Sequence, residues 1–357
     1  MSEFEQRRRA VSGELAKREV EALVVSSPAN IRYLTGFAGS NALMLVSEGE
    51  AHFFTDPRYT GEAATVPAKS HVAKGLLILA VASIIKRKRL KKVGFEPTWM
   101  DMDQHGRIEK ALERRATLHP VASLIEEQRA VKSPAEIAII RRSVQANSEA
   151  YARTLKRIRG GLKELEIAAE LEFQMKVLGS EKPAFDTIVA VGDHSALPHA
   201  HPTQRRLEIN ELLLIDMGAT VDGYTSDMTR VAFTGRPPKR VRELYRAVLE
   251  AQLAGLDAVR PGVSVKQVDA AAREVLKGYN LEKEFMHSTG HGLGLEIHET
   301  PKIGKKEKTK LRAGMVITIE PGAYLPGFGG VRIEDTALVT ERGCEVLTPT
   351  PKELVNL

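Results

Sequence analysis

Two predicted strands that are joined by a tight turn each carry an aspartate in apolar surroundings. Residues 211–219 (ELLLIDMGA) are apolar enough for both faces of a strand to be buried, and Asp216 lies among them. A turn signal at 222–223 (DG) follows, and residues 224–233 (YTSDMTRVAF) return as a second strand that carries Asp227. Because a buried carboxylate requires a partner, the chain must supply one to this hairpin.

The register of the hairpin predicts that both aspartates share one face. With a two-residue loop at 222–223, opposed residues sum to 445, so Asp216 faces Thr229 and lies diagonal to Asp227. Diagonal neighbours are about 7 to 8 Å apart at the backbone, so both carboxylates can reach one cation if the strands contain no bulge. Two uncompensated carboxylates raise each other's pKa and need an arginine, a lysine or a metal ion. An ion pair with an arginine, such as the adjacent Arg230, is therefore as good an interpretation here as a metal ion.

Further histidines and glutamates favour the metal. Residues 287–299 (HSTGHGLGLEIHE) hold three histidines among glycines, and imidazole is a good ligand for divalent ions. Residues 314–322 (GMVITIEPG) predict a strand that ends at Glu320 before a Pro-Gly turn, and residues 330–338 (GVRIEDTAL) predict a strand that contains Glu334. Four carboxylates and a histidine in β-rich surroundings suit two divalent ions, which indicates a two-metal hydrolytic site.

The chain as a whole predicts two domains. Residues 1–126 alternate helix and strand patterns, which indicates an α/β amino-terminal domain. A Ser-Pro helix start at 133–134 opens the second domain, residues 127–357, in which helical patterns alternate with β-rich segments. This pattern predicts an α+β domain with a curved antiparallel sheet covered by helices. The long helices are expected at 134–158, 165–178 and 239–259.

Composition narrows the classes of function. A single cysteine, Cys344, excludes an intramolecular disulfide and a thiolate zinc cluster, so we expect a reducing, cytoplasmic location. The apolar run 76–85 is about half the roughly 20 residues that span a bilayer, so we expect no membrane partner. The net charge of +6 includes a basic run at 86–92 (KRKRLKK) without interleaved aromatic residues. We therefore interpret this run as a solvated helix end and expect no nucleic-acid partner.

At the histidine and carboxylate motifs the sequence resembles the pita-bread-fold dinuclear metallopeptidases, in the branch of Xaa-Pro aminopeptidases and prolidases (Xaa-Pro dipeptidases). Residues 287–299 match the signature of this branch at every restricted position. The resemblance covers the whole chain, with a creatinase- and prolidase-like amino-terminal domain before the pita-bread catalytic domain. It implies two divalent ions per subunit, with Mn²⁺ expected and Co²⁺ or Zn²⁺ as alternatives. The implied ligands are Asp216, Asp227, His291, Glu320 and Glu334.

The resemblance also implies a role for each residue of the site. Asp216 serves one ion, His291 and Glu320 serve the other, and Asp227 and Glu334 bridge the two. A two-metal-activated hydroxide attacks the peptide carbonyl. Glu320 accepts the proton and passes it on to the proline nitrogen, which leaves as a secondary amine.

Four more residues are implied on the substrate side. His298 stabilises the carbonyl oxygen, His199 reaches over the site from a flexible loop, and His287 lies near the proline ring. Arg332 orients a carboxylate and offsets negative charge. The role of His201, next to the motif that carries His199, stays open.

The expected reaction is hydrolysis of the bond between an amino-terminal residue and proline. We expect an Xaa-Pro aminopeptidase that acts on proline-containing peptides and forms a homodimer, as the resemblance implies. The alternative is an Xaa-Pro dipeptidase, which must bind the free carboxylate of proline with an arginine or lysine, such as Arg32 or Arg58. A catalytically inactive peptide-binding relative ranks lower, because all five implied ligands are present. Creatinase-like amidine hydrolysis and methionine aminopeptidase rank lower as well.

Overall fold

The computed structural model describes residues 1–357 and divides into two compact units, Met1–Arg129 and Ala130–Leu357. Residue 126, after which the sequence predicts the domain boundary, lies within the last helix of the first unit. None of the helices has the length and apolar character that crossing a membrane would require.

The first unit is built on a six-stranded mixed sheet in the order β4-β3-β2-β1-β5-β6. The helix and strand alternation predicted for this region includes strands at 22–26, 42–46 and 51–55, which correspond to β1, β2 and β3 to within one residue at each end. Its strands are β1 (Ala22–Val25), β2 (Ala42–Ser47), β3 (Glu50–Thr55), β4 (Lys69–Val72), β5 (Lys92–Phe95) and β6 (Thr117–Pro120). Its helices are α1 (Glu3–Glu14), α2 (Pro28–Thr35), α3 (Thr60–Ala63), α4 (Leu77–Lys88), α5 (Met102–Leu112) and α6 (Leu124–Arg129).

Helix α4 takes up both the apolar run and the basic run of the sequence. Its buried face, with Ile78, Val81 and Ile85, packs on the sheet core together with α5. Its last turn carries Lys86, Arg87 and Lys88, where positive charges interact favourably with the carbonyl end of a helix. The interpretation of the basic run as a helix end is therefore confirmed.

The second unit holds four long helices and several mainly antiparallel sheets. Its helices are α7 (Pro134–Leu155), α8 (Glu164–Val177), α9 (Lys239–Asp257) and α10 (Val265–Gly278). The strands on the amino-terminal side of α9 are β7 (Lys182–Pro183), β8 (Ile188–Val191), β9 (Leu212–Met217), β10 (Ala219–Val221), β11 (Tyr224–Thr225) and β12 (Met228–Phe233). The later strands are β13 (Gly290–Gly292), β14 (Glu299–Ile303), β15 (Val316–Ile319), β16 (Gly322–Leu325), β17 (Gly329–Arg332), β18 (Asp335–Val339), β19 (Cys344–Val346) and β20 (Val355–Asn356).

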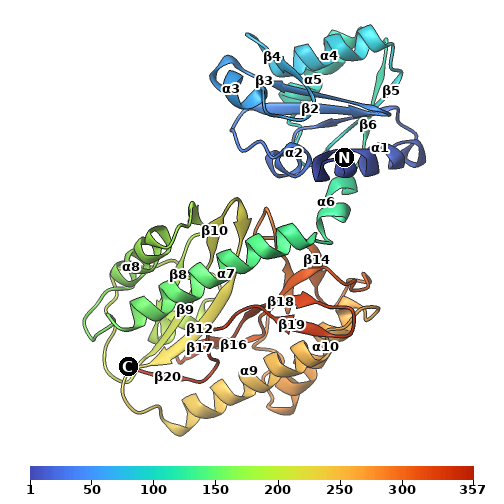
Figure 1. Ribbon diagram of the computed structural model, residues 1–357. Coiled ribbons are helices and arrows are strands. Elements are labelled where there is room, and N and C mark those ends of the chain that lie inside the picture. Colours follow the sequence, from blue (N-terminus) through green and yellow to red (C-terminus); the bar gives the residue numbers. More distant parts are fainter. The chain divides into compact units, whose positions relative to one another are not determined.

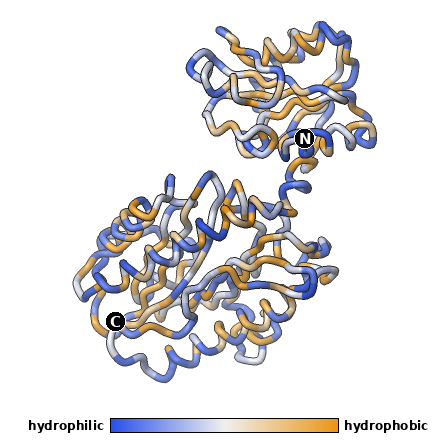
Figure 2. The backbone as a smooth tube through the Cα atoms, in the orientation of Figure 1, coloured by the Kyte–Doolittle hydropathy of each residue, from blue (hydrophilic) through white to orange (hydrophobic).

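Two sheets form the centre of this unit, and helices cover them. The strand orders are β20-β12-β9-β8 and β14-β13-β15-β18-β19. Figure 1 shows α7 and α8 on one side of the strands and α9 and α10 on the other. Apolar residues run along the strands between these helices (Figure 2), and the buried clusters join helix to sheet on both sides. The predicted α+β domain with a helix-covered sheet is confirmed, but the sheet is not purely antiparallel, because β20 pairs with β12 in parallel.

The helix predictions hold for three helices and omit a fourth. The ranges predicted at 134–158, 165–178 and 239–259 correspond to α7, α8 and α9, each ending one to three residues earlier than predicted. A capping box fixes the start of α7, because Ser133 and Glu136 satisfy each other's backbone amides. Helix α10 carries the same signal, in which Ser264 and Gln267 form the box, so its start could have been predicted as well.

The register of the first hairpin is as predicted. Thr229 pairs with Asp216, and Val221 pairs with Tyr224, so opposed residues sum to 445 on both sides of the break between β9 and β10. No bulge intervenes, and the two aspartates therefore lie on one face of the sheet.

A second pair of strands differs from the prediction. Glu334 does not lie within a strand, because the strand predicted at 330–338 divides into β17 and β18 on either side of residues 333–334. The predicted Pro-Gly turn after Glu320 is also absent, because the chain continues directly into β16. The physical reason is a change of partner. Strand β15 pairs with β18 in one sheet, whereas β16 pairs with β17 in another, and each glutamate lies where its chain crosses between the sheets.

The buried side chain of Arg230 ties β12 to the crossing at Glu334. Its guanidinium is 2.7 Å from Asp335 Oδ1 and donates to the carbonyl oxygens of Glu334 (2.6 Å) and Pro351 (2.9 Å). Arg230 is 2% exposed. Removing the charge would leave these acceptors buried with fewer partners.

We expect Arg230→Met to lower the free energy of unfolding of the second unit by about 3 to 5 kcal/mol, the usual cost of breaking a buried ion pair. Denaturant titration followed by circular dichroism would measure the loss. The matched control is Arg142→Met, which removes an exposed arginine paired with Asp222 and should cost less than about 0.5 kcal/mol. Equal losses in the two variants would contradict the structural role of Arg230.

Candidate active site

The residues predicted for the site meet in one cavity of about 820 Å³ in the second unit. They come from β9, β13 and β17, from the segment just before β12, from the two strand crossings and from three loops, so only the folded chain brings them together. The predicted residues that line the cavity are His199, His201, Asp216, Asp227, His287, His291, His298, Glu320, Arg332 and Glu334.

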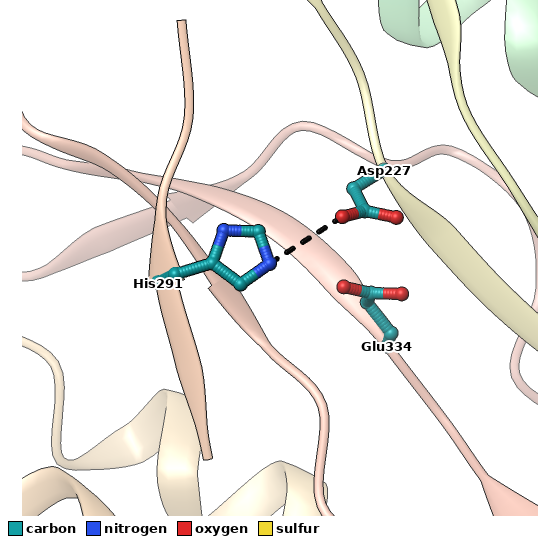
Figure 3. A group of neighbouring side chains, drawn as sticks. All are labelled: Asp227, His291 and Glu334. Atoms are coloured by element: carbon teal, nitrogen blue, oxygen red, sulfur yellow. Dashed lines mark ion pairs between the residues drawn. The ribbon is translucent and has the colours of Figure 1, made fainter. Parts of the chain in front are cut away.

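A compact group of ligand atoms lies at the floor of this cavity. One ligand atom from each of Asp227, His291 and Glu334 lies within 4.8 Å of the others. Figure 3 shows the three side chains pointing toward one another from three separate segments of the chain. His291 Nε2 is 3.5 Å from Asp227 Oδ2 and 3.4 Å from Glu320 Oε1. A single divalent ion placed among these atoms would contact several of them at once.

The two strand registers explain this convergence. Ile319 pairs with Asp335, and Gly322 pairs with Arg332, so the residue numbers of each pair sum to 654. The same sum places Glu320 opposite Glu334, with both side chains on the face that meets the first hairpin. A hydrogen bond joins the two hairpins, because Thr229 Oγ1 donates to Glu334 Oε2 at 2.8 Å.

Burial makes this group of carboxylates unfavourable without further positive charge. Burial, followed by the charge of Glu334, raises the pKa of Asp227 well above its ordinary value. Burial, followed by the charge of Glu320, likewise raises the pKa of Glu334. Burial raises the pKa of Glu320 itself to about 7. For the neighbouring His291, burial lowers the pKa, so its imidazole is neutral and its ring nitrogen can act as a ligand.

The protein supplies one positive charge to these carboxylates, and it comes from Arg332. Its Nη2 atom donates to Asp216 Oδ2 at 2.6 Å, and the side chain is 3% exposed. An arginine partner for one aspartate of the hairpin is thus confirmed, but it is not Arg230, which pairs with Asp335 on the other side of the sheet. One guanidinium cannot balance four carboxylates, so the arginine does not replace the metal.

The donors present fit divalent metal ions. Asp216 Oδ1 and Glu334 Oε1 are buried without a hydrogen-bond partner, which is costly for a carboxylate oxygen unless a cation binds it. Carboxylate oxygens and one neutral imidazole suit Mn²⁺, Co²⁺ or Zn²⁺. The residues that would hold such ions are those implied from the sequence: Asp216, Asp227, His291, Glu320 and Glu334.

Tyr324, which the sequence did not single out, connects the metal ligands to the substrate side. Its hydroxyl accepts from Arg332 Nη1 at 2.7 Å and lies 2.8 Å from His287 Nε2. His287 Nδ1 is 2.8 Å from the carbonyl oxygen of Ser288, so Nδ1 carries the proton and Nε2 accepts from the tyrosine. Burial lowers the pKa of His287 to about 3 and raises that of Tyr324 to about 12, so both are neutral. Nothing local in the sequence marks this tyrosine, because the β16–β17 pairing brings it to Arg332 and the tertiary fold brings it to His287.

Another residue that the sequence did not single out, Glu164, positions the loop that carries His199 and His201. Its carboxylate is fully buried and accepts from Val191 N (2.8 Å) and from Thr203 N (2.8 Å). These bonds hold the loop at both ends, while both histidines are exposed and line the cavity. The two histidines are thus placed where they can contact a bound peptide.

His298 and Lys302 complete the wall of the cavity. The ring of His298 packs edge-on against His291, with centroids 4.5 Å apart, and burial lowers its pKa. Lys302 is exposed and is the register partner of His291 across β13 and β14, so both side chains lie on the same face. No local pattern marks Lys302, because it lies eleven residues from His291 and only the strand pairing brings it to the cavity.

We expect removal of metal by a chelator to lower the melting temperature and Mn²⁺ to restore it, because only ionised carboxylates bind the ion and the ion offsets their mutual repulsion. The variant Asp227→Asn should lose the rise on adding Mn²⁺. Without metal it should be at least as stable as the metal-free wild type, because it removes one repelling carboxylate. Differential scanning calorimetry measures both quantities.

Asp186→Asn is the matched control, since Asp186 is an exposed aspartate of the same cavity and should keep the rise on adding Mn²⁺. A melting temperature of the wild type that is indifferent to both chelator and metal would contradict the assignment of a metal site.

Each of the two units matches a known protein family. Metallopeptidase family M24 matches residues 138–341, and the creatinase/prolidase N-terminal domain matches residues 7–131. An Xaa-Pro dipeptidase of Pyrococcus furiosus is 37% identical over 341 residues, which cover 95% of this chain and 96% of that protein.

Two solved structures superpose on nearly the whole chain. The Xaa-Pro dipeptidase from Bacillus anthracis does so with a TM-score of 0.96 at 36% identity, covering 99% of this chain and 100% of that chain. An X-Pro aminopeptidase from Thermotoga maritima has a TM-score of 0.89 at 34% identity, covering 96% of this chain and 99% of that chain. The chain therefore belongs to metallopeptidase family M24, a family that implies divalent metal ions. A creatinase/prolidase N-terminal domain comes first in the chain, and a pita-bread catalytic domain follows it.

Proposed function

We propose that this protein is an Xaa-Pro dipeptidase, which hydrolyses the bond before proline in dipeptides. The relatives from Pyrococcus furiosus and Bacillus anthracis carry that name, which supports the dipeptidase more than the aminopeptidase placed first from the sequence. The aminopeptidase stays the second candidate, because the structural neighbour from Thermotoga maritima is named an X-Pro aminopeptidase.

The observation that carries the proposal is the position of Lys302. A dipeptide differs from a longer peptide by the free carboxylate on its proline, and an enzyme restricted to dipeptides needs a cation to bind it. Lys302 supplies an exposed ammonium on the wall of the cavity, on the same strand face as His291. The candidates considered from the sequence, Arg32 and Arg58, belong to the other unit, where Arg58 pairs with Asp56 at 2.7 Å.

The chemistry follows from the residues around the metal ligands. Two divalent ions held by the five ligands would lower the pKa of water and polarise the peptide carbonyl. Glu320, whose Oε1 accepts from Thr318 Oγ1 at 3.2 Å, is placed to take a proton from the attacking water and return it to the proline nitrogen. His298 and His199 offer N–H groups to the carbonyl oxygen, on which negative charge develops.

The remaining residues orient the substrate and the ligands. His287 is kept neutral by burial and presents a ring face for proline, and Phe285 packs edge-on against it with centroids 4.9 Å apart. Arg332 holds Asp216 and leaves its second oxygen for an ion. We assign no catalytic step to His201.

Three further statements belong to this proposal. We propose Mn²⁺ as the native ion, which the oxygen-rich ligand set supports. We also propose a homodimer, supported by the family resemblance, and a cytoplasmic location, supported by the single cysteine.

The proposal is tested with manganese-loaded protein on the dipeptide Ala-Pro and the tripeptide Ala-Pro-Ala. We expect Ala-Pro to be cleaved with the higher kcat/KM, because only its proline carboxylate can pair with Lys302. Release of alanine, measured by chromatography, gives both rates. Preference for the tripeptide would favour the aminopeptidase. Failure to cleave either peptide with Mn²⁺ or Co²⁺ would favour an inactive relative.

Replacement of Lys302 tests the role of its charge directly. We expect Lys302→Gln to raise the KM for Ala-Pro about 10- to 100-fold, corresponding to a charge-assisted hydrogen bond of about 1.5 to 3 kcal/mol, and to leave the KM for Ala-Pro-Ala nearly unchanged. Lys305→Gln is the control, since this lysine pairs with Glu282 and does not line the cavity. An equal rise for both peptides would show that Lys302 does not recognise the carboxylate.

A further inference from the structure

A buried ion pair at the wall of the cavity, which Glu299 helps to line, has no part in the proposed chemistry. Lys132 Nζ is 3.0 Å from Glu299 Oε2, and the two side chains are 1% and 5% exposed. Glu299 follows His298 in the chain. The ammonium of Lys132 therefore pairs with the residue next to His298, whose imidazole faces the substrate.

The backbone around Lys132 is firmly anchored. Its N–H donates to the carbonyl oxygen of Gly314 at 2.9 Å, and Val131 bridges to Met315 just before β15. Ser133 then caps α7. Lys132 thus presents its ammonium from a fixed point between α7 and the central sheet.

The chain between His291 and His298 surrounds the carboxylate of Glu299. Glu299 Oε1 accepts from the N–H of Glu296 at 3.1 Å. A Cβ atom added to Gly294 would lie 2.8 Å from both carboxylate oxygens, so the turn has room only for glycine there. The carbonyl oxygen of Gly294 in turn accepts from Thr225 N at 2.7 Å. The carboxylate of Glu299 therefore supports the loop of residues 293–298 from the interior of the protein.

The ion pair matters because an unpaired charge is energetically unfavourable at a buried position. Without the ammonium, the Glu299 carboxylate must take up a proton or move toward water. Either change disturbs the turn held by the Glu296 amide, and His298 is the next residue outward. The His298 ring packs on His291, so a shift of the loop changes how His298 meets a peptide in the cavity.

We propose that Lys132 is a positioning residue, which through its ion pair with Glu299 fixes loop 293–298 and holds the His298 imidazole in place at the cavity. The kinetic consequence of this positioning rests on the proposed function. The position of the loop itself does not, because it can be measured without a substrate.

The first test is kinetic and uses manganese-loaded protein with Ala-Pro. We expect Lys132→Met to lower kcat about 10- to 100-fold with little change in KM, because His298 acts on the reacting carbonyl, and small misplacements of such groups are costly. Lys132→Arg keeps the charge and should restore most of kcat. The control Arg141→Met removes an exposed arginine that pairs with Glu345 and should leave kcat unchanged.

A double variant separates positioning from folding. Lys132→Met combined with Glu299→Gln leaves no unbalanced charge, so it should fold even if the single variant does not. We expect its kcat to stay low at a melting temperature near that of the wild type. A wild-type kcat in this double variant would overturn the proposal.

The His298→Ala background tests whether the effect passes through His298. Adding Lys132→Met to His298→Ala should lower kcat no further, because the group being positioned is already gone. A further drop as large as that in the wild type would overturn the proposal, because Lys132 would then act by another route.

A last measurement needs no activity. Diethyl pyrocarbonate modifies accessible imidazoles, and peptide mass spectrometry reports its rate at each histidine. We expect the rate at His298 to rise several-fold in Lys132→Met and in the double variant, with His201 on a separate loop as the internal reference. An unchanged rate at His298 would overturn the proposal. A raised rate in a protein that cleaves no Xaa-Pro peptide would support the positioning and reject only the proposed function.

Discussion

The burial of four carboxylates at one place is the constraint on which the catalytic unit depends. Asp216 and Asp227 come from one hairpin, and Glu320 and Glu334 come from the two points where strands cross between sheets. Burial and mutual repulsion raise the pKa of three of them, so the arrangement is unfavourable unless positive charge is added. Divalent metal ions bound by these carboxylates would supply that charge and would activate water for hydrolysis.

The surrounding structure holds these carboxylates in place from behind. Arg332 binds Asp216 and is itself held by Tyr324, while Arg230 ties the backbone at Glu334 to β12. Lys132 does the same for the loop of His298 through Glu299. Each of these cations is buried and paired with a single carboxylate, so each neutralises its own partner and leaves the ligand oxygens free to bind metal ions.

Local patterns in the sequence are sufficient to predict much of the backbone arrangement of this site. The apolar strand around Asp216, the Asp-Gly turn and the alternation of the return strand predict a register that the structure confirms pair by pair. The prediction is less accurate at Glu334, because an apolar run reads as one strand even where its two halves pair in different sheets. Strand pairing or tertiary packing brings each of four further residues to its partners, so no local sequence signal marks Tyr324, Glu164, Lys302 or Lys132.

The sequence by itself determined the two kinds of domain and the first hairpin with its register, because short-range alternation, capping and turn chemistry set these features. The metal ligands were implied only by the resemblance of its motifs to a known family. Only the tertiary structure decided which arginine balances which carboxylate, which lysine faces the cavity, and how Glu320 comes to lie opposite Glu334. The physical reason is that charge compensation depends on distance in space. In this chain, the fold brings together charged partners that are separated by up to 204 residues.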